Sequence, residues 1–177
     1  MPLATAFLDS AISRSEYYKE LGDNSFSQIA DADFHVQPNG VSNSIAVIIG
    51  HMAGNMLSRW TNFLTEDGEK TWRDRDGEFQ EPALDRAALI ALWEKGWDCY
   101  MSALGSLKED DLLRTITIRS ESLTVVDAIN RQLAHYPYHV GQIVYLARML
   151  KGDGWKSLSI PRGDSEAFNR SVGHGKR

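Results

Sequence analysis

Four segments of the chain repeat their apolar residues at helical spacing, and this period constrains the fold more than any other feature of the sequence. The first segment covers residues 3–21, and the Gly-Asp-Asn sequence at 22–24 is predicted to end it. The second is predicted to begin near Ser42 or Asn43, either of which can cap a helix, and to end near Thr65.

The third and fourth segments have similar boundary signals. The third is predicted to start after Pro82, a residue that suits the first turn of a helix. The fourth begins after Thr124, whose hydroxyl can cap it, and ends at the Gly-Asp-Gly sequence 152–154. Because amphipathic helices bury their apolar faces against one another, the sequence predicts an all-α four-helix bundle.

Two short β-branched runs, residues 115–119 and 122–125, precede the fourth segment. They alternate in polarity around a break at 120–121, so a small β-hairpin is predicted, although the break lacks a glycine. The connection between the second and third helices, residues 66–82, is long and polar. Connections of this length tend to be functional or to span a bundle from end to end.

The charge balance excludes some partners. The chain has 19 Lys and Arg against 24 Asp and Glu, which gives a net charge of −5. We therefore expect no binding to nucleic acid, which requires clustered cations. The longest stretch without a charged side chain, residues 34–58, contains Pro38 and many polar residues, so no membrane span is expected.

Cys99 is the single cysteine, so no internal disulfide can form. The N-terminus has neither the basic nor the apolar region of a signal peptide. Both observations indicate a cytoplasmic protein. Cys99 lies within the third apolar segment, where a buried inert thiol is a better interpretation than a nucleophile.

His135 and His139 lie four residues apart in the fourth predicted helix, so both project from one face about one turn apart. Two imidazoles at this spacing can hold one metal ion. Gln132 and Gln142 extend the polar strip by one turn in each direction. Pro137 lies between the histidines and either kinks the helix to aim them or serves packing alone. The alternative for the pair is two half-buried histidines with hydrogen-bonded ring nitrogens.

His51 lies in the apolar second segment and could face the pair, because four-helix bundles build metal sites on facing helices. Three neutral imidazoles would leave a divalent ion at least one open position, as in catalytic zinc sites. Such an ion can activate water or a thiol, and imidazole suits Zn, Ni, Cu and Fe alike. Asn55, Gln132 and Gln142 could orient a ligand, or they are plain amides at the edge of the core.

Three motifs stand out along the chain: residues 135–143 (His-Tyr-Pro-Tyr-His-Val-Gly-Gln-Ile), 72–76 (Trp-Arg-Asp-Arg-Asp) and 157–163 (Ser-Leu-Ser-Ile-Pro-Arg-Gly). Together they resemble one branch of the DinB/YfiT-like superfamily, a branch catalogued as a domain of unknown function. The resemblance covers nearly the whole chain. It implies an up-down-down-up bundle, a homodimer, and a three-His site for a divalent metal, Zn or Ni, at His51, His135 and His139.

Some members of this superfamily are thiol-dependent transferases or isomerases that use bacillithiol, mycothiol or glutathione, and others have no known activity. The first hypothesis is therefore a metal-dependent thiol S-transferase, or a related hydrolase-like protein, that activates a low-molecular-weight thiol. The second is a non-catalytic dimeric metal-binding or stress-associated module in which the metal stabilises the bundle. A fold shared by several activities does not decide between them.

Two of the three motifs lack a helical or strand period, and each contains an arginine. Arginine suits carboxylates, which the thiols of this superfamily carry. We predict that Arg73 or Arg162 faces the mouth of the metal pocket and binds substrate. The alternative is that each arginine pairs with a nearby aspartate, such as Asp74, Asp76 or Asp164, and holds an irregular segment in place.

The second and third helices carry more apolar area than one small bundle needs, in the side chains of Trp60, Phe63, Trp93, Trp97, Tyr100 and Met101. An exposed patch of this kind marks an interface, so a homodimer is predicted. The alternative is that all six fill a single core. Residues 1–154 are expected to form the bundle. Residues 155–177 are expected to form a tail that packs on the bundle or a partner and has a mobile end; neither His35 nor His174 is assigned to the metal.

Overall fold

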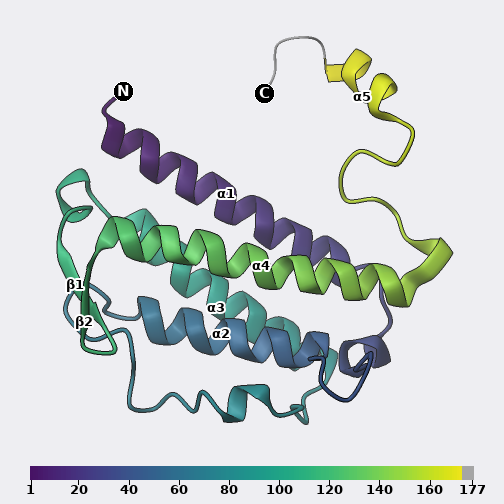
Figure 1. Ribbon diagram of the computed structural model, residues 1–177, viewed down its shortest axis with the longest axis horizontal. Coiled ribbons are helices and arrows are strands. Elements are labelled where there is room, and N and C mark those ends of the chain that lie inside the picture. Colours follow the sequence, from purple (N-terminus) through teal and green to yellow (C-terminus); the bar gives the residue numbers. More distant parts are fainter. Residues whose placement is uncertain (173–177) are drawn as a thin grey trace.

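The computed structural model describes residues 1–172, so His174 and the end of the tail lie outside the described residues. Four long helices form the predicted bundle: α1 (Leu3–Phe26), α2 (Ile45–Trp60), α3 (Arg86–Ser106) and α4 (Val125–Lys151). Figure 1 shows α1 and α4 running in one direction and α2 and α3 in the other, which is the up-down-down-up arrangement. The closest helix pairs are α2 with α3 and α1 with α4.

The first helix does not end at residues 22–24 as predicted but continues to Phe26. A Cβ atom on Gly22 would lie 2.5 Å from the Trp93 ring, so this glycine allows α1 and α3 to approach closely. The next residue, Asp23, accepts a hydrogen bond of 2.7 Å from the indole N–H of Trp93. Gly22 is thus a packing residue within α1, and the helix continues through it to Phe26.

The starts of α2 and α3 differ from the prediction because other residues cap them. Ser44, rather than Ser42 or Asn43, accepts the N–H of Val47 at 3.1 Å. Asp85 accepts the N–H of Ala88 at 2.8 Å, so Pro82 lies before the helix and not in its first turn.

The end of α2 also differs, since the helix stops at Trp60 and not near Thr65. Asn62 has a φ of 50°, in the left-handed region that no right-handed helix can include. The chain therefore turns shortly after Trp60 and enters the long connection.

The predicted hairpin is present as two antiparallel strands, β1 (Thr115–Ile118) and β2 (Glu121–Thr124), with Ile118 opposite Glu121. The turn residues are Arg119 and Ser120, one position earlier than predicted. Both have positive φ, 55° and 63°, which normally favours glycine or asparagine. The carboxylate of Asp67 accepts both of their backbone N–H groups at 2.9 Å and so stabilises this conformation.

The connection between α2 and α3 runs back along the length of the bundle beside α2 (Figure 1). Because α2 and α3 are parallel, the chain must return from the end of α2 to the start of α3 at the opposite end of the bundle. It contains a short 3₁₀ helix, η2 (Gly77–Phe79), which packs on α2. Further 3₁₀ turns are η1 (Asp31–His35), η3 (Glu109–Asp111) and η4 (Gly152–Gly154). In residues 1–172 no helix combines the length and the apolar character needed to cross a membrane.

The aromatic residues of α2 and α3 lie in the core of the bundle, as the alternative to an interface predicted for them. Five of the six predicted interface residues are buried, namely Trp60, Phe63, Trp93, Trp97 and Tyr100. Tyr136 of α4 joins them, with its ring 5.1 Å from that of Tyr100. The aromatic area therefore gives no support to the homodimer, which stays a prediction. Cys99 lies in α3 as predicted, beside Thr61, but it is half-buried rather than buried.

The tail meets the bundle only at its beginning among the residues that the structure describes. Gln28, just after α1, exchanges two hydrogen bonds with the backbone of Lys156, and Trp155 packs against the core. From Ser159 to Ser171 every residue is exposed, and the short helix α5 (Ser165–Val172) stands away from the bundle in Figure 1.

Candidate metal centre

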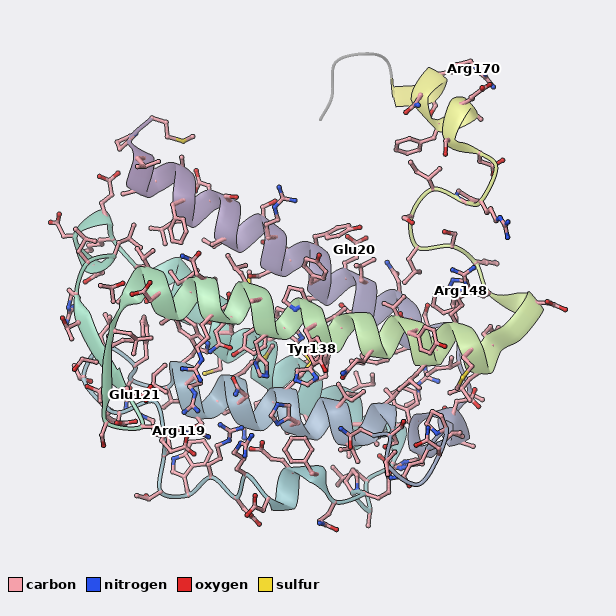
Figure 2. The ribbon with its side chains drawn as sticks, viewed as in Figure 1. Glu20, Arg119, Glu121, Tyr138, Arg148 and Arg170 are labelled. Carbon is pink, nitrogen blue, oxygen red and sulfur yellow. The ribbon has the colours of Figure 1, made fainter. Side chains whose placement is uncertain are left out.

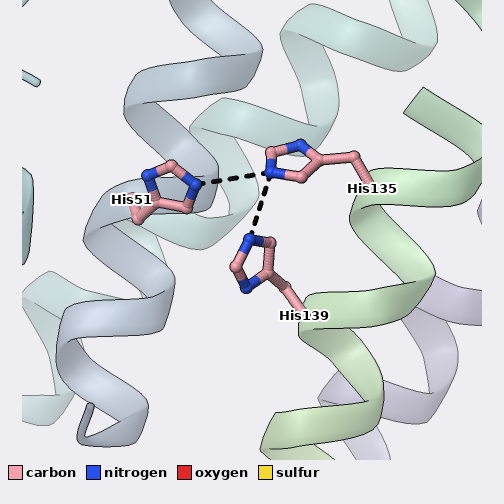
Figure 3. Close-up of side chains that lie close together, drawn as sticks. All are labelled: His51, His135 and His139. Carbon is pink, nitrogen blue, oxygen red and sulfur yellow. Dashed lines mark hydrogen bonds between the residues drawn. The ribbon is translucent and has the colours of Figure 1, made fainter. Parts of the chain in front are cut away.

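The bundle brings together the three histidines that the sequence singled out. His51 projects from α2, and His135 and His139 project from successive turns of α4 on the face opposite (Figure 3). The Nε2 atom of His135 lies 3.4 Å from Nε2 of His51 and 3.1 Å from Nε2 of His139. The helix α4 continues through Pro137, between the two histidines.

The outer nitrogens of two rings are held by acceptors, which sets the inner nitrogens for metal binding. Nδ1–H of His51 donates to the carboxylate of Glu78 at 3.1 Å, and Nδ1–H of His139 donates to the amide oxygen of Gln142 at 3.0 Å. Because these oxygens only accept, the proton stays on Nδ1 and Nε2 presents a lone pair. A carboxylate or carbonyl behind the histidine is the usual partner of a metal-ligating imidazole.

The donor set fits a divalent metal ion. All three ligand atoms lie within 4.8 Å of one another. In a tetrahedral zinc site with Zn–N bonds of about 2.0–2.1 Å, neighbouring nitrogens are about 3.3 Å apart. The observed separations of 3.1 and 3.4 Å lie on either side of this value. Without a cation, Nε2–H of His135 can donate to the Nε2 lone pair of either His51 or His139, but not to both. A metal ion can accept the Nε2 lone pairs of all three histidines.

The electrostatic environment of His135 and His139 favours their neutral form. Burial, together with the neighbouring His139 and His51, lowers the pKa of His135 to about 4. Burial also lowers the pKa of His139, although its bond to Gln142 acts in the other direction. Since a metal binds only the deprotonated ring, both shifts favour a metal ligand at neutral pH.

Behind His51 lies a buried ion pair that the sequence did not predict. Arg73 donates from Nε and Nη2 to the two carboxylate oxygens of Glu78 at 2.6 and 2.7 Å. The Arg73 side chain is only 1% exposed and that of Glu78 10%. Burial raises the pKa of Glu78, but the bonds from Arg73 and His51 outweigh this and hold the pKa below its usual value. Glu78 is therefore ionised and acts on His51 as a charged acceptor.

Glu78 reaches His51 because α2 has a gap in its surface at this point. A Cβ atom on Gly54 would lie 2.1 Å from the carboxylate of Glu78, so only glycine leaves room for it. The ring of Phe79 stacks on His51 with a centroid distance of 4.7 Å. A glycine one turn from a candidate ligand on an apolar helix is the signal that could have pointed to Glu78, although the partner itself lies in an aperiodic connection.

The three predicted amides lie at the site in different ways. Gln142 holds His139, as described above, while Asn55 and Gln132 line a cavity of about 600 Å³ beside the histidines. The amide oxygen of Asn55 accepts a hydrogen bond of 3.2 Å from the hydroxyl of Tyr136. Tyr138 of α4, labelled in Figure 2, also lines this cavity and packs edge-on against His139.

Neither predicted substrate-binding arginine lines the cavity. Arg73 lies close to the histidines, but its guanidinium is buried against Glu78. The alternative, in which Arg73 pairs with a neighbouring aspartate, is also wrong in its partner: Arg73 pairs with Glu78, and Asp74 accepts the backbone N–H of Gly77 at 2.9 Å. Arg162 lies in the exposed tail, away from the cavity lining.

A family model described as a protein of unknown function (DUF1572) matches residues 2–164. No curated protein matches the sequence. The matched region includes all four long helices and the three histidines, and its description carries no activity.

Proposed function

The chain belongs to the DUF1572 family of proteins of unknown function, so we propose its function from the geometry of the site. We propose that it is a metalloprotein in which His51, His135 and His139 hold a divalent ion. The observation that carries this proposal is the convergence of three Nε2 atoms, two of them backed by acceptors on Nδ1. Zn and Ni are the metals we expect, because the resemblance to the DinB/YfiT-like superfamily implies them; imidazole by itself suits Cu and Fe as well. The likeness of the motifs to the DinB/YfiT-like superfamily supports the same three ligands.

When bound, a divalent ion with three imidazole ligands supplies a Lewis acid that favours the deprotonated form of a thiol or water ligand. The protein residues have separate tasks around it. Glu78 keeps the proton of His51 on Nδ1, and Gln142 does the same for His139. The cavity beside the histidines gives a small molecule access to the open position.

We propose that the reaction is transfer of a low-molecular-weight thiol to an electrophile. Support comes from the resemblance to a superfamily with thiol-dependent members and from the open three-His donor set. The test is conjugation of a thiol to a model electrophile by metal-loaded protein. We expect His135→Ala to lose the acceleration and His35→Ala, which alters a histidine outside the site, to keep it. Equal rates for wild type and His135→Ala across several thiols would rule out this reaction.

A second candidate is a non-catalytic metal-binding module, and the helix packing favours it specifically. α2 packs mainly on α3, and α4 mainly on α1, so α2 and α4 are the facing helices with less direct contact. Because His51 comes from α2 and the other two ligands from α4, a metal ion would tie the two pairs together. This candidate predicts a large rise in melting temperature on metal binding and no turnover with any thiol.

A further inference from the structure

Four arginines line the cavity beside the histidines, and they come from four separate parts of the chain. Arg59 belongs to α2, Arg75 to the long connection, Arg119 to the hairpin turn and Arg131 to α4. Among residues 1–172, no aspartate or glutamate lines the same cavity. This is unusual in a chain whose net charge is −5.

The positive charge of the cavity is only partly neutralised. A single oxygen of Glu69 accepts from Arg59 at 2.8 Å and from Nε of Arg119 at 2.9 Å. Within the described part of the chain, neither Arg75 nor Arg131 forms an ion pair. Among the described residues, the ion pairs give these four guanidinium groups one carboxylate, that of Glu69, which Arg59 and Arg119 share. Like charges that converge on one cavity repel each other unless an anion binds between them.

Arg119 is held in place by an arrangement that a surface arginine does not need. It occupies the hairpin turn with a φ of 55°, a conformation that carries strain for any residue with a side chain. Asp67 offsets the strain by accepting the N–H groups of Arg119 and Ser120. Glu69 binds Nε, so the two terminal nitrogens have no bond to any described residue and remain available to a ligand. Figure 2 shows Arg119 at the end of the hairpin.

The neutral groups of the cavity point to a ligand as well. Trp60 donates to the hydroxyl of Tyr136, and this hydroxyl donates to the oxygen of Asn55. The amide of Asn55 is thereby oriented, and its nitrogen remains as a donor at the cavity wall. Gln132 is 2% exposed, and its side-chain oxygen has no hydrogen-bond partner among the described residues. A buried unpartnered oxygen of this kind fits a hydrogen-bond donor on the ligand.

We infer that the cavity is an oxyanion subsite: it binds a small molecule through a carboxylate or phosphate held by Arg75, Arg119 and Arg131, with a hydrogen-bond donor toward Gln132. This inference deepens the proposed function and rests on it for the metal, because the bound molecule would lie between the arginines and the three-His centre. The subsite itself is formed by arginines and can be tested without metal. Guanidinium groups suit both carboxylates and phosphates, so binding must decide between the two.

The test is calorimetric titration of the full chain, metal-free and zinc-loaded, with inorganic phosphate, succinate, mercaptosuccinate and the uncharged succinamide. We expect one of the oxyanions to bind, succinamide not to bind, and the affinity to fall with ionic strength. Arg119→Gln and Arg131→Gln should each weaken oxyanion binding about ten-fold, since each removes a charged hydrogen-bond donor. Arg148→Gln serves as the control, because Arg148 lies on the same helix as Arg131 but at its far end (Figure 2).

Each outcome separates this inference from the proposed function. Oxyanion affinity that is unchanged in Arg119→Gln and Arg131→Gln, or absent in the wild type, overturns the subsite even if metal binds to the histidines. Oxyanion binding that depends on the arginines, in a chain that binds no metal, overturns the proposed function and leaves the subsite. If succinamide binds as well as succinate does, the inference is also contradicted, because recognition of the ligand would then not depend on its charge.

Discussion

Glu78→Gln removes the charge that both holds His51 and neutralises the buried Arg73, so it should affect stability and metal binding together. Arg73 is 1% exposed and bonded to both oxygens of Glu78. Removing one partner of a buried ion pair costs about 3–5 kcal/mol of stability, which a domain of this size can lose and still fold. The glutamine oxygen can still accept from His51, but without a charge, so metal affinity should fall about 10–100-fold.

The assay combines urea unfolding of the metal-free chain with a metal titration against a chelator. Arg73→Met/Glu78→Gln should recover part of the lost stability, because no charge then stays buried without a partner, but should not recover the metal affinity. This contrast separates the ion pair from the orientation of His51. Glu81→Gln is the matched control, since Glu81 pairs with His35 in a more exposed position and should change stability by less than about 1 kcal/mol.

The reasoning fails if Glu78→Gln unfolds like the wild type and binds metal with the same affinity. It also fails if the double variant regains full metal affinity, because the carboxylate would then have no part in holding His51.

Two further predictions concern the single positions His135 and Gly54, and a third concerns the oligomeric state. In the metal-free chain, where burial lowers the pKa of His135 from 6.5 to about 4, the unfolded state binds more protons between these pH values, so the free energy of unfolding should fall on acidification. We expect a loss of about 1–2 kcal/mol after solvent screening, measured by urea unfolding, and the same loss in His135→Ala would contradict it. Gly54→Ala should displace Glu78 and weaken metal binding, despite the better helix propensity of alanine, and an unchanged metal titration would refute the packing argument. The predicted homodimer should appear in sedimentation velocity, and a concentration-independent monomer would exclude it.

The histidine pair could be predicted because its geometry is local. The spacing of His135 and His139 within one helix sets their separation whatever the rest of the fold does. The position of His51 opposite them depends on how two helices pack, and it became predictable only with the bundle. The predicted ends of α4 are confirmed, with Thr124 and Gly152 as its caps. They could be predicted because a cap acts on backbone groups close to it in the sequence.

The remaining boundaries and contacts depend on residues that are distant in the sequence. Gly22 looked like a helix end, but its role is to admit the ring of Trp93 from α3. The hairpin turn forms without glycine because Asp67, far along the chain, binds its two N–H groups. Glu78 and Arg73 lie in a connection without periodicity, so their own segment gives no sign that they support His51; only Gly54 on α2 marks the place.

The four arginines of the cavity show the same limit more clearly. Each lies in a different segment, and only Arg75 belongs to a motif, residues 72–76, that the sequence singled out. The sequence pointed to Arg73 and Arg162, whereas the structure brings Arg119, Arg131 and, from the motif that contains Arg73, Arg75 to the cavity. Convergence of like charges is a property of the fold and cannot be read from spacing.

The central claim is that the three histidines hold one divalent ion, and elemental analysis of protein purified without a histidine tag tests it most directly. We expect about one ion of Zn or Ni per chain in the wild type, on the basis of a single three-ligand site, and a loss of that ion in His51→Ala. A metal content well below one ion per chain in the wild type, or an equal content in His51→Ala, would contradict the account.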